Sequence, residues 1–126
     1  MLARHEAGDR VLELRPVADR AEVLDAQDAA RRVHASKALR DYIVTLIRRT
    51  REDARVELGA SPRAGLMLLR AAKARALLLG RDHALPDDVQ ALADPVLSHR
   101  IMLVPEATGS TREQVVADAV AMTPAL

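Results

Sequence analysis

The chain has 126 residues and a net charge of +1 at pH 7, and 49% of its residues are hydrophobic. This is enough chain for one domain with a hydrophobic core, and no apolar run approaches the roughly 20 residues that a membrane span needs. Tyr42 is the only Phe, Tyr or Trp, and the absence of cysteine excludes disulfides and thiolate metal sites. A core of aliphatic side chains and alanine favours packed helices over a sheet, and the lack of a signal-peptide pattern leads us to expect a cytoplasmic protein.

The charges are unevenly distributed along the chain. Residues 31–81 contain 13 Arg and Lys against 4 Asp and Glu, a balance of +9, whereas the two flanks together have a balance of −8. Acidic and basic helices that complement each other in one bundle would explain this pattern. Alternatively, the basic middle of the chain faces an anion, such as a nucleotide or an acidic partner surface. Composition leaves both explanations open.

Capping residues predict the first two helices. Within residues 1–18, "MLARHEAGDR" is compatible with the end of a helix that began before Met1, and "VLELRPV" is too short and isolated to be more than an extended connector. Asp19 and Glu22 form a capping box for a helix that runs to about Arg32, and Ser36 caps the next helix. The apolar residues of this second helix fall on one stripe, formed by Leu39, Tyr42, Ile43, Leu46 and Ile47. We expect the charged run "RRTREDAR" to form the exposed end of that helix.

A third helix is predicted from Pro62 to Leu79. Ser61 can cap it, proline suits the first helical position, and Gly80 can end it. Apolar residues on nearly every side of this helix indicate a central, buried position.

The fourth helix is predicted to begin at Pro86, where Asp87 and Asp88 match the positive end of the helix dipole. Its predicted inner stripe is Val89, Leu92, Val96 and Leu97. We expect Pro95 to kink or split this helix, with Asp94 capping the second piece.

A last helix is predicted to about Met122, opened by a capping box of Ser110 and Glu113. The sequence therefore predicts an all-α fold, a small bundle of four main helices plus a C-terminal helix.

Few residues form a pattern that carries chemistry. The chain has four histidines: His5, His34, His83 and His99. None has a partner at the spacing of a metal site, and there is no GxxxxGK[ST] loop and no Ser/His/Asp set, so we predict no metal centre and no complete enzyme. We interpret Asp87 and Asp88 as dipole-matching residues rather than paired catalytic carboxylates. His99-Arg100 is either another dipole match, near a helix end, or a contact to a partner or nucleotide.

Arg63 occupies a position that is locally unfavourable. It lies in the first turn of the third helix, at the positive end of the dipole, where a cation costs roughly 0.3–1 kcal/mol. One explanation is an exposed arginine whose long stem covers apolar surface. The other is a bound anion, because free N–H groups at a helix start attract phosphate and a guanidinium adds charge-assisted hydrogen bonds. The residues alone do not decide between the two.

Three stretches resemble the C-terminal part of MoxR-type AAA+ ATPases: "DYIVTLIRRTRE" (41–52), "LGASPRAGLMLLRAAKARALLLGRDHALPDDVQALA" (58–93) and "VLSHRIML" (96–103). In that family a tyrosine-led helix ending in Thr-Arg precedes a G-A-S-P-R-A helix start. A G-R-D element, a Pro-acid-Asp-Val helix start and a closing Leu-x-His-Arg follow in the same order. The resemblance extends from about Val33 to Leu103.

The resemblance implies that residues 19–126 are the helical lid domain that follows the α/β nucleotide-binding core in a subunit of an ATPase ring. Residues 1–18 would be the connector from that core. The family's sensor-2 arginine, which contacts the γ-phosphate of ATP, falls on Arg63. The implied nucleotide-binding residues are therefore Ser61, Pro62 and Arg63, with Arg63 as the catalytic one. ATP itself would be held, with Mg²⁺, by the core domain.

The resemblance also implies the partners of such a lid in a chaperone-like ATPase. These are the AAA+ core of the same protein, neighbouring subunits of a homo-oligomeric ring, and proteins with a von Willebrand factor A domain; neither nucleic acid nor a membrane is implied. Walker A, Walker B, sensor-1 and arginine-finger elements are absent from the sequence, so we expect the chain to be inactive alone. The family's usual capping threonine before Pro86 is Leu85 here, which should weaken that N-cap by about 1 kcal/mol.

Two other functions compete with the lid. One is a stand-alone basic helical module that binds nucleic acid through the middle of the chain. The lack of aromatic residues for base stacking and of a helix-turn-helix glycine spacing argues against it. The other is a bundle that only binds a protein partner. Salt-dependent DNA binding would favour the first of these two, whereas rescue of a separately made AAA+ core would favour the lid.

Overall fold

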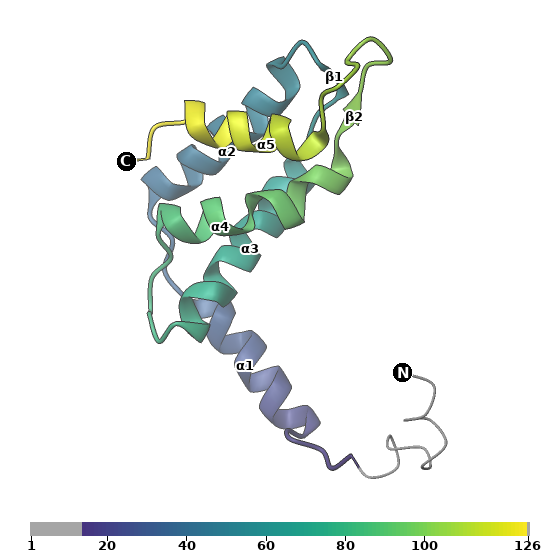
Figure 1. Cartoon of the computed structure of the whole chain (residues 1–126). Coiled ribbons are helices and arrows are strands. Elements are labelled where there is room, and N and C mark those ends of the chain that lie inside the picture. Colours follow the sequence, from purple (N-terminus) through teal and green to yellow (C-terminus); the bar gives the residue numbers. More distant parts are fainter. Residues whose placement is uncertain (1–13, 126) are drawn as a thin grey trace, which may run out of the picture.

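Helices make up most of the chain in the computed structural model, which describes residues 14–125 (Figure 1). In chain order the described elements are α1 (Arg20–Arg32), α2 (Lys37–Glu52), β1 (Val56–Leu58), α3 (Pro62–Leu78), α4 (Pro86–Leu97), the 3₁₀ helix η3 (Ser98–Arg100), β2 (Met102–Leu103) and α5 (Arg112–Met122). The predicted all-α fold is confirmed, with one small two-stranded sheet added within residues 14–125. No helix in this range combines the length and apolar character that a membrane crossing requires.

The predicted caps define the first three helices. Asp19 and Glu22 form both bonds of a capping box, and the Ser36 hydroxyl accepts a hydrogen bond from the Leu39 N–H at 3.0 Å. Ser61 likewise accepts from the Ala64 N–H at 3.3 Å. Gly80 has φ +73°, the left-handed conformation that ends helices readily at glycine. Local side-chain chemistry therefore sets these boundaries.

The core forms around α3, which contacts α1, α2 and α4, while α5 packs against α4 and α2 (Figure 1). The predicted stripe of α2 is buried, with every member at most 6% exposed: Leu39, Tyr42, Ile43, Leu46 and Ile47. α3 is central as predicted, but it is not buried all round, since Leu66 and Leu78 are 58% and 86% exposed. Its small residues, such as Gly65 and Ala72, face the neighbouring helices.

Truncation of the α2 stripe should destabilise the bundle strongly. Leu46 is fully buried in the core, so we expect Leu46→Ala to lower the free energy of unfolding by about 2–5 kcal/mol, through lost burial and the cavity left behind. Urea unfolding followed by circular dichroism measures this change. Val44→Ala is the matched control, because Val44 lies on the same helix but is 49% exposed. A loss below about 1 kcal/mol for Leu46→Ala would show that the stripe does not form the core.

The prediction that Pro95 splits the fourth helix is wrong. α4 is continuous from Pro86 to Leu97, with Pro95 inside it. The proline removes one backbone donor, but it lies two residues before the end of the helix, so little helix follows the lost hydrogen bond. Asp94 caps no second piece, and its carboxylate instead accepts a hydrogen bond from the Ser98 hydroxyl.

The predicted start of the last helix is displaced by one residue. The stretch "STREQ" contains two overlapping capping boxes, and the structure uses Thr111 with Gln114 rather than Ser110 with Glu113. Thr111 accepts from the Gln114 N–H at 3.2 Å, and the Gln114 side chain accepts from the Thr111 N–H at 2.9 Å. The Ser110 N–H is already bonded to the carbonyl of Ala107 in the preceding turn. The turn therefore selects the second box.

A short antiparallel sheet joins distant parts of the chain. β1 follows α2 and β2 follows η3, and Val56 pairs with Leu103 and Leu58 with Met102. Strands of two and three residues carry no readable period, which explains why the sequence did not predict them. The pairing places the end of η3 beside the segment that leads into α3.

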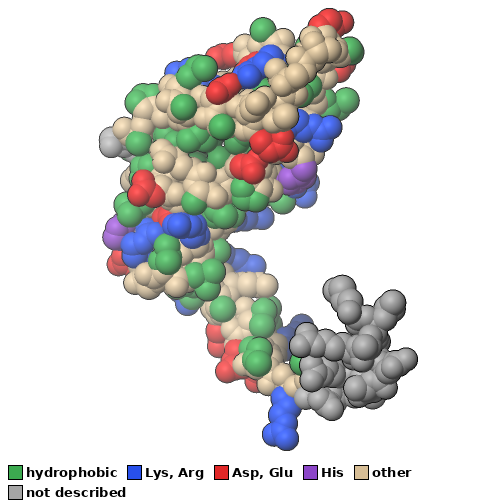
Figure 2. All heavy atoms as spheres, viewed as in Figure 1, with side chains coloured by type: hydrophobic (Ala, Val, Ile, Leu, Met, Phe, Trp, Pro, Cys, Tyr) green, Lys and Arg blue, Asp and Glu red, His purple; other side chains and the backbone are tan. Residues whose placement is uncertain are grey.

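The predicted connector lies largely outside the described residues, which begin at Leu14. Residues 14–18 are exposed, and α1 has no buried residue. α1 packs against α3, where the Lys73 ammonium donates to the Arg31 carbonyl at 3.0 Å, and its other end projects from the bundle (Figure 1). Acidic side chains are visible along this projecting helix in Figure 2.

Candidate functional site

The three predicted nucleotide-binding residues form the first turn of α3. Ser61 is the N-cap and Pro62 is the first helical residue, so both have the positions at the helix start that the sequence predicted. Arg63 follows with an exposed side chain, which makes no hydrogen bond or ion pair with the part of the chain that the structure describes. No acidic residue occupies the first turn. The positive end of this helix therefore carries an additional positive charge without an internal counter-ion.

The end of α2 holds the segment that leads into this turn. The Thr50 hydroxyl accepts from the Ala60 N–H at 3.1 Å, and the Arg51 Nε donates to the Ala60 carbonyl at 2.8 Å. Thr50 was expected on the exposed end of its helix, but it is fully buried because it contacts this backbone. Sequence reasoning missed both residues; the only signal was the Thr-Arg pair at the end of the tyrosine-led helix.

Two further arginines of the chain lie near the start of α3. Arg51 and Arg100 line a hollow of about 500 Å³ together with Glu57, Leu58, Gly59 and Ser61. The Nε of Arg100 is buried and has no partner among the described residues. The β1–β2 pairing brings Arg100 to this position. His99, its neighbour in sequence, points elsewhere and lines a different hollow with Asp94 and Arg112. The His99-Arg100 pair is therefore divided between two surfaces.

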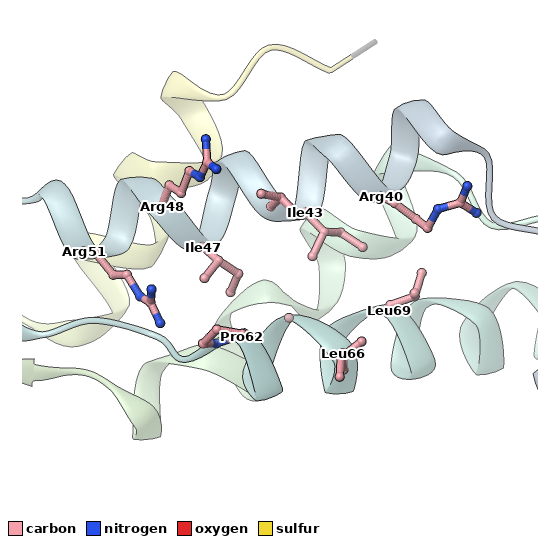
Figure 3. Close-up of a pocket in the computed structure, with 10 residues that line it drawn as sticks. Arg40, Ile43, Ile47, Arg48, Arg51, Pro62, Leu66 and Leu69 are labelled. Atoms are coloured by element: carbon pink, nitrogen blue, oxygen red, sulfur yellow. The ribbon is translucent and has the colours of Figure 1, made fainter.

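An apolar groove of about 550 Å³ runs between α2 and α3, and Pro62 is one of the residues that line it (Figure 3). Aliphatic side chains form its floor: Ile43, Ile47, Leu66 and Leu69. Arginines from α2 stand along it, and Figure 3 shows Arg51 reaching toward the segment before Pro62. Arg51 thus lines both this groove and the hollow beside Ser61, and Pro62 lines the groove and begins α3.

Ion pairs neutralise part of the basic middle of the chain. Carboxylates from the flanking regions pair with four of its arginines: Arg31, Arg55, Arg75 and Arg81. The first explanation of the charge pattern, complementary helices, therefore holds for these residues. The arginines at the start of α3 and along the groove form no ion pair within residues 14–125. Their charges are therefore available to an external anion, as the second explanation requires.

Asp88 lies in the first turn of α4, as its interpretation as a dipole match requires, but it also has a second role in the core. Its carboxylate is fully buried and accepts hydrogen bonds from Arg75 at 2.6 Å and from Arg81 at 2.6 and 2.8 Å. It also accepts from the Leu85 N–H at 2.9 Å, so half of a capping box forms although leucine cannot supply the other half. The hydrogen bonds from Arg81 lower the pKa of Asp88 to about 2. Asp88 thus stabilises the α3–α4 connection, and Asp87 remains exposed.

Two of the histidines, His34 and His83, lie where two connections of the chain are joined by backbone hydrogen bonds. His34 and His83 form an isolated bridge between the connections that follow α1 and α3, and the His83 Nδ1 lies 2.8 Å from Asp82. Over residues 14–125 no group of three potential metal ligands comes together. His5 lies outside the described residues.

Comparison with known proteins gives one family and several relatives. The model of the AAA lid domain family matches residues 48–119. An uncharacterized protein of Bacillus subtilis, YeaC, is 39% identical over 107 residues, which are 85% of this chain and 33% of that protein. Protein MoxR of Paracoccus denitrificans is 42% identical, over 57% of this chain and 25% of that protein. Chaperone MoxR1 of Mycobacterium tuberculosis is 36% identical, over 68% of this chain and 25% of that protein.

A solved structure has the same fold. The crystal structure of a putative ATPase from Cytophaga hutchinsonii matches with a TM-score of 0.79 and 31% sequence identity, covering 84% of this chain and 36% of that chain. The chain thus spans between a quarter and a third of the length of these three curated relatives.

Proposed function

Because this chain belongs to the AAA lid domain family and is the lid of a MoxR-type AAA+ ATPase, we propose that it supplies Arg63 to the γ-phosphate of ATP bound on an AAA+ core domain. One observation carries this proposal. Arg63 is an exposed cation in the first turn of a capped helix, where the dipole disfavours it and no acidic residue of that turn compensates. A phosphate bound there would turn both features into favourable interactions.

The surroundings of Arg63 fit a phosphate ligand. Arg51 and Arg100 line the hollow beside Ser61 together with Glu57, so two arginines and one carboxylate leave a net positive charge near the start of α3. In this proposal Ser61 and Pro62 fix the backbone of the turn, and Arg63 contacts the phosphate.

The rest of the proposal concerns the whole ATPase. The core domain holds ATP and Mg²⁺, residues 1–18 connect it to the lid over 19–126, and closing of the lid couples hydrolysis to motion in a homo-oligomeric ring. A chaperone-like role in the cytoplasm, beside proteins with a von Willebrand factor A domain, completes it. The lid match, the MoxR relatives and the putative ATPase structure support the ATPase and chaperone parts of this proposal.

Reconstitution tests this function. The chain is joined through its N-terminal end to the AAA+ core of a MoxR relative whose own lid has been removed, which gives the reconstituted ATPase. We expect the core without a lid to hydrolyse ATP poorly and the reconstituted ATPase to regain turnover. If the chain does not raise turnover although the fusion is folded and assembled, the lid function is contradicted.

The isolated chain should bind ATP only weakly. One helix start with its arginines provides part of a phosphate site, and no aromatic side chain is present to stack on adenine. We expect a dissociation constant above about 1 mM in isothermal titration calorimetry, corresponding to less than about 4 kcal/mol of binding free energy. Micromolar binding by the chain alone would show a complete nucleotide site and contradict the division between core and lid.

A further inference from the structure

The backbone of Ala60 is bonded on both sides by consecutive residues of α2. The Thr50 hydroxyl accepts from its N–H at 3.1 Å and donates to the Ile47 carbonyl at 2.8 Å, so both hydrogen-bonding directions of that hydroxyl are used. The Arg51 Nε donates to the Ala60 carbonyl at 2.8 Å. Thr50 and Ala60 are both fully buried, so water cannot replace the bond between them. Ala60 lies directly before the N-cap of α3.

Gly59 allows this close contact. A Cβ atom at position 59 would lie 2.6 Å from the Arg51 Cγ and 2.7 Å from both the Arg51 Cα and the Thr50 carbonyl oxygen. Two of these three atoms belong to the backbone of α2, which cannot rotate away as a side chain end can. The segment that enters α3 therefore lies against the last turn of α2 with no room for a side chain.

These contacts decide where the first turn of α3 stands relative to α2. The first turn of a helix lacks half of the hydrogen bonds of its interior and frays readily unless its entry is fixed. Here the entry is fixed by two bonds to one residue and by a backbone contact at its neighbour. Figure 3 shows the resulting arrangement, with Arg51 crossing from α2 to the segment before Pro62.

We propose that Thr50 and Arg51 are positioning residues, which hold the start of α3 so that Arg63 meets the phosphate of ATP. This inference rests on the proposed function. Neither residue needs to touch the nucleotide; both act on Arg63 through the Ala60 backbone. A displacement of about 1 Å at a phosphoryl-contacting group can cost about 100-fold in rate, so a small shift of this turn is enough to matter.

Thr50→Val in the reconstituted ATPase is the cleanest test. Valine keeps the shape of threonine but leaves the Ala60 N–H without its acceptor, and we expect turnover at saturating ATP to fall by about 10- to 100-fold. Thr50→Ser keeps the hydroxyl and should recover most of the turnover. Thr123→Val is the matched control, because Thr123 is also buried and bonded to its own helix, at Ala119, but lies at the end of α5. Its turnover should stay within about twofold of the wild type.

The double variant separates positioning from general stability. If Thr50 acts through Arg63, adding Thr50→Val to Arg63→Ala should reduce turnover by less than about twofold, because the contact is already lost. Arg51→Lys, which keeps the positive charge but removes the Nε–H that donates to the Ala60 carbonyl, should behave in the same way and replaces Thr50→Val if that variant does not fold. Circular dichroism confirms folding of each variant.

Two outcomes would overturn the inference, and they differ from failure of the proposed function. Wild-type turnover of folded Thr50→Val and Arg51→Lys, with a large loss for Arg63→Ala, would show that Arg63 needs no such positioning. Equal losses for Thr50→Val with and without Arg63 would show an effect that does not pass through Arg63. Wild-type turnover of Arg63→Ala would instead contradict the proposed function itself.

Discussion

Asp88→Asn should lower the free energy of unfolding by about 2–3 kcal/mol, the interaction energy that corresponds to a pKa lowered from 3.8 to about 2. The carboxylate is fully buried and holds Arg75 and Arg81 with three hydrogen bonds, so one side chain joins α3, the following connection and α4. An amide of the same shape supplies one acceptor and places its own N–H groups against two guanidinium groups. Urea unfolding at neutral pH measures the loss, and Asp87→Asn is the control, because Asp87 lies in the same turn but is exposed. Equal, small effects of the two substitutions would show that the Asp88 cluster contributes little.

The wild type and Asp88→Asn should also differ in how their stability depends on pH. Because the folded state lowers the pKa of Asp88 from 3.8 to about 2, its contribution to stability is complete above the unfolded value and is lost as the pH falls through the folded one. The stability difference between the wild type and Asp88→Asn should therefore be constant above about pH 5 and shrink between about pH 4 and pH 2. Acid unfolding of both proteins measures it. A difference that does not change over this interval would contradict the lowered pKa.

Arg63→Ala should reduce ATP turnover of the reconstituted ATPase by one to three orders of magnitude. A charge-assisted contact to a transferring phosphoryl group is typically worth about 3–4 kcal/mol, and nothing else in the first turn of α3 carries a charge. The lid itself should be as stable as before or slightly more so, because the substitution removes a cation from the unfavourable end of the dipole. Arg63→Lys should restore only part of the turnover, since an ammonium cannot form the fork-shaped contact of a guanidinium.

Unfolding of the chain and turnover of the reconstituted ATPase are measured on the same variants. Arg70→Ala is a suitable control, because Arg70 is another exposed arginine of α3 but lies two turns further along the helix. A structural role of Arg63 would give the reverse pattern, with a clear loss of stability and normal turnover per folded ring.

Features that depend on a few neighbouring residues could be predicted from the sequence. The caps at Asp19, Ser36 and Ser61 act within one turn, and the α2 stripe follows directly from the helical period. The place of Ser61, Pro62 and Arg63 at the start of α3 was predictable for the same reason, since they are consecutive, whereas the contact of Arg63 with a phosphate stays a prediction. Where two local solutions overlapped, as at Ser110 and Thr111, the prediction took the wrong one.

Features that depend on contacts between elements could not be predicted in this way. Arg75 and Arg81 reach Asp88 across 13 and 7 positions, and Arg51 reaches Ala60 across 9, so no periodic pattern relates them. Arg100 lies beside Ser61 because two very short strands pair. Charge counts predicted a surplus in the middle of the chain, but only the fold shows which arginines are neutralised.

The central claim is that Arg63 contacts the γ-phosphate of ATP, and a structure of the reconstituted ATPase with a non-hydrolysable ATP analogue tests it most directly. We expect a guanidinium nitrogen of Arg63 within about 2.7–3.2 Å of a γ-phosphate oxygen, the distance of a hydrogen bond. The first turn of α3 should face the phosphates, and Ala60 should keep its bonds to Thr50 and Arg51. A closed, nucleotide-bound lid in which the Arg63 side chain points to solvent, or to another protein surface, would contradict the account.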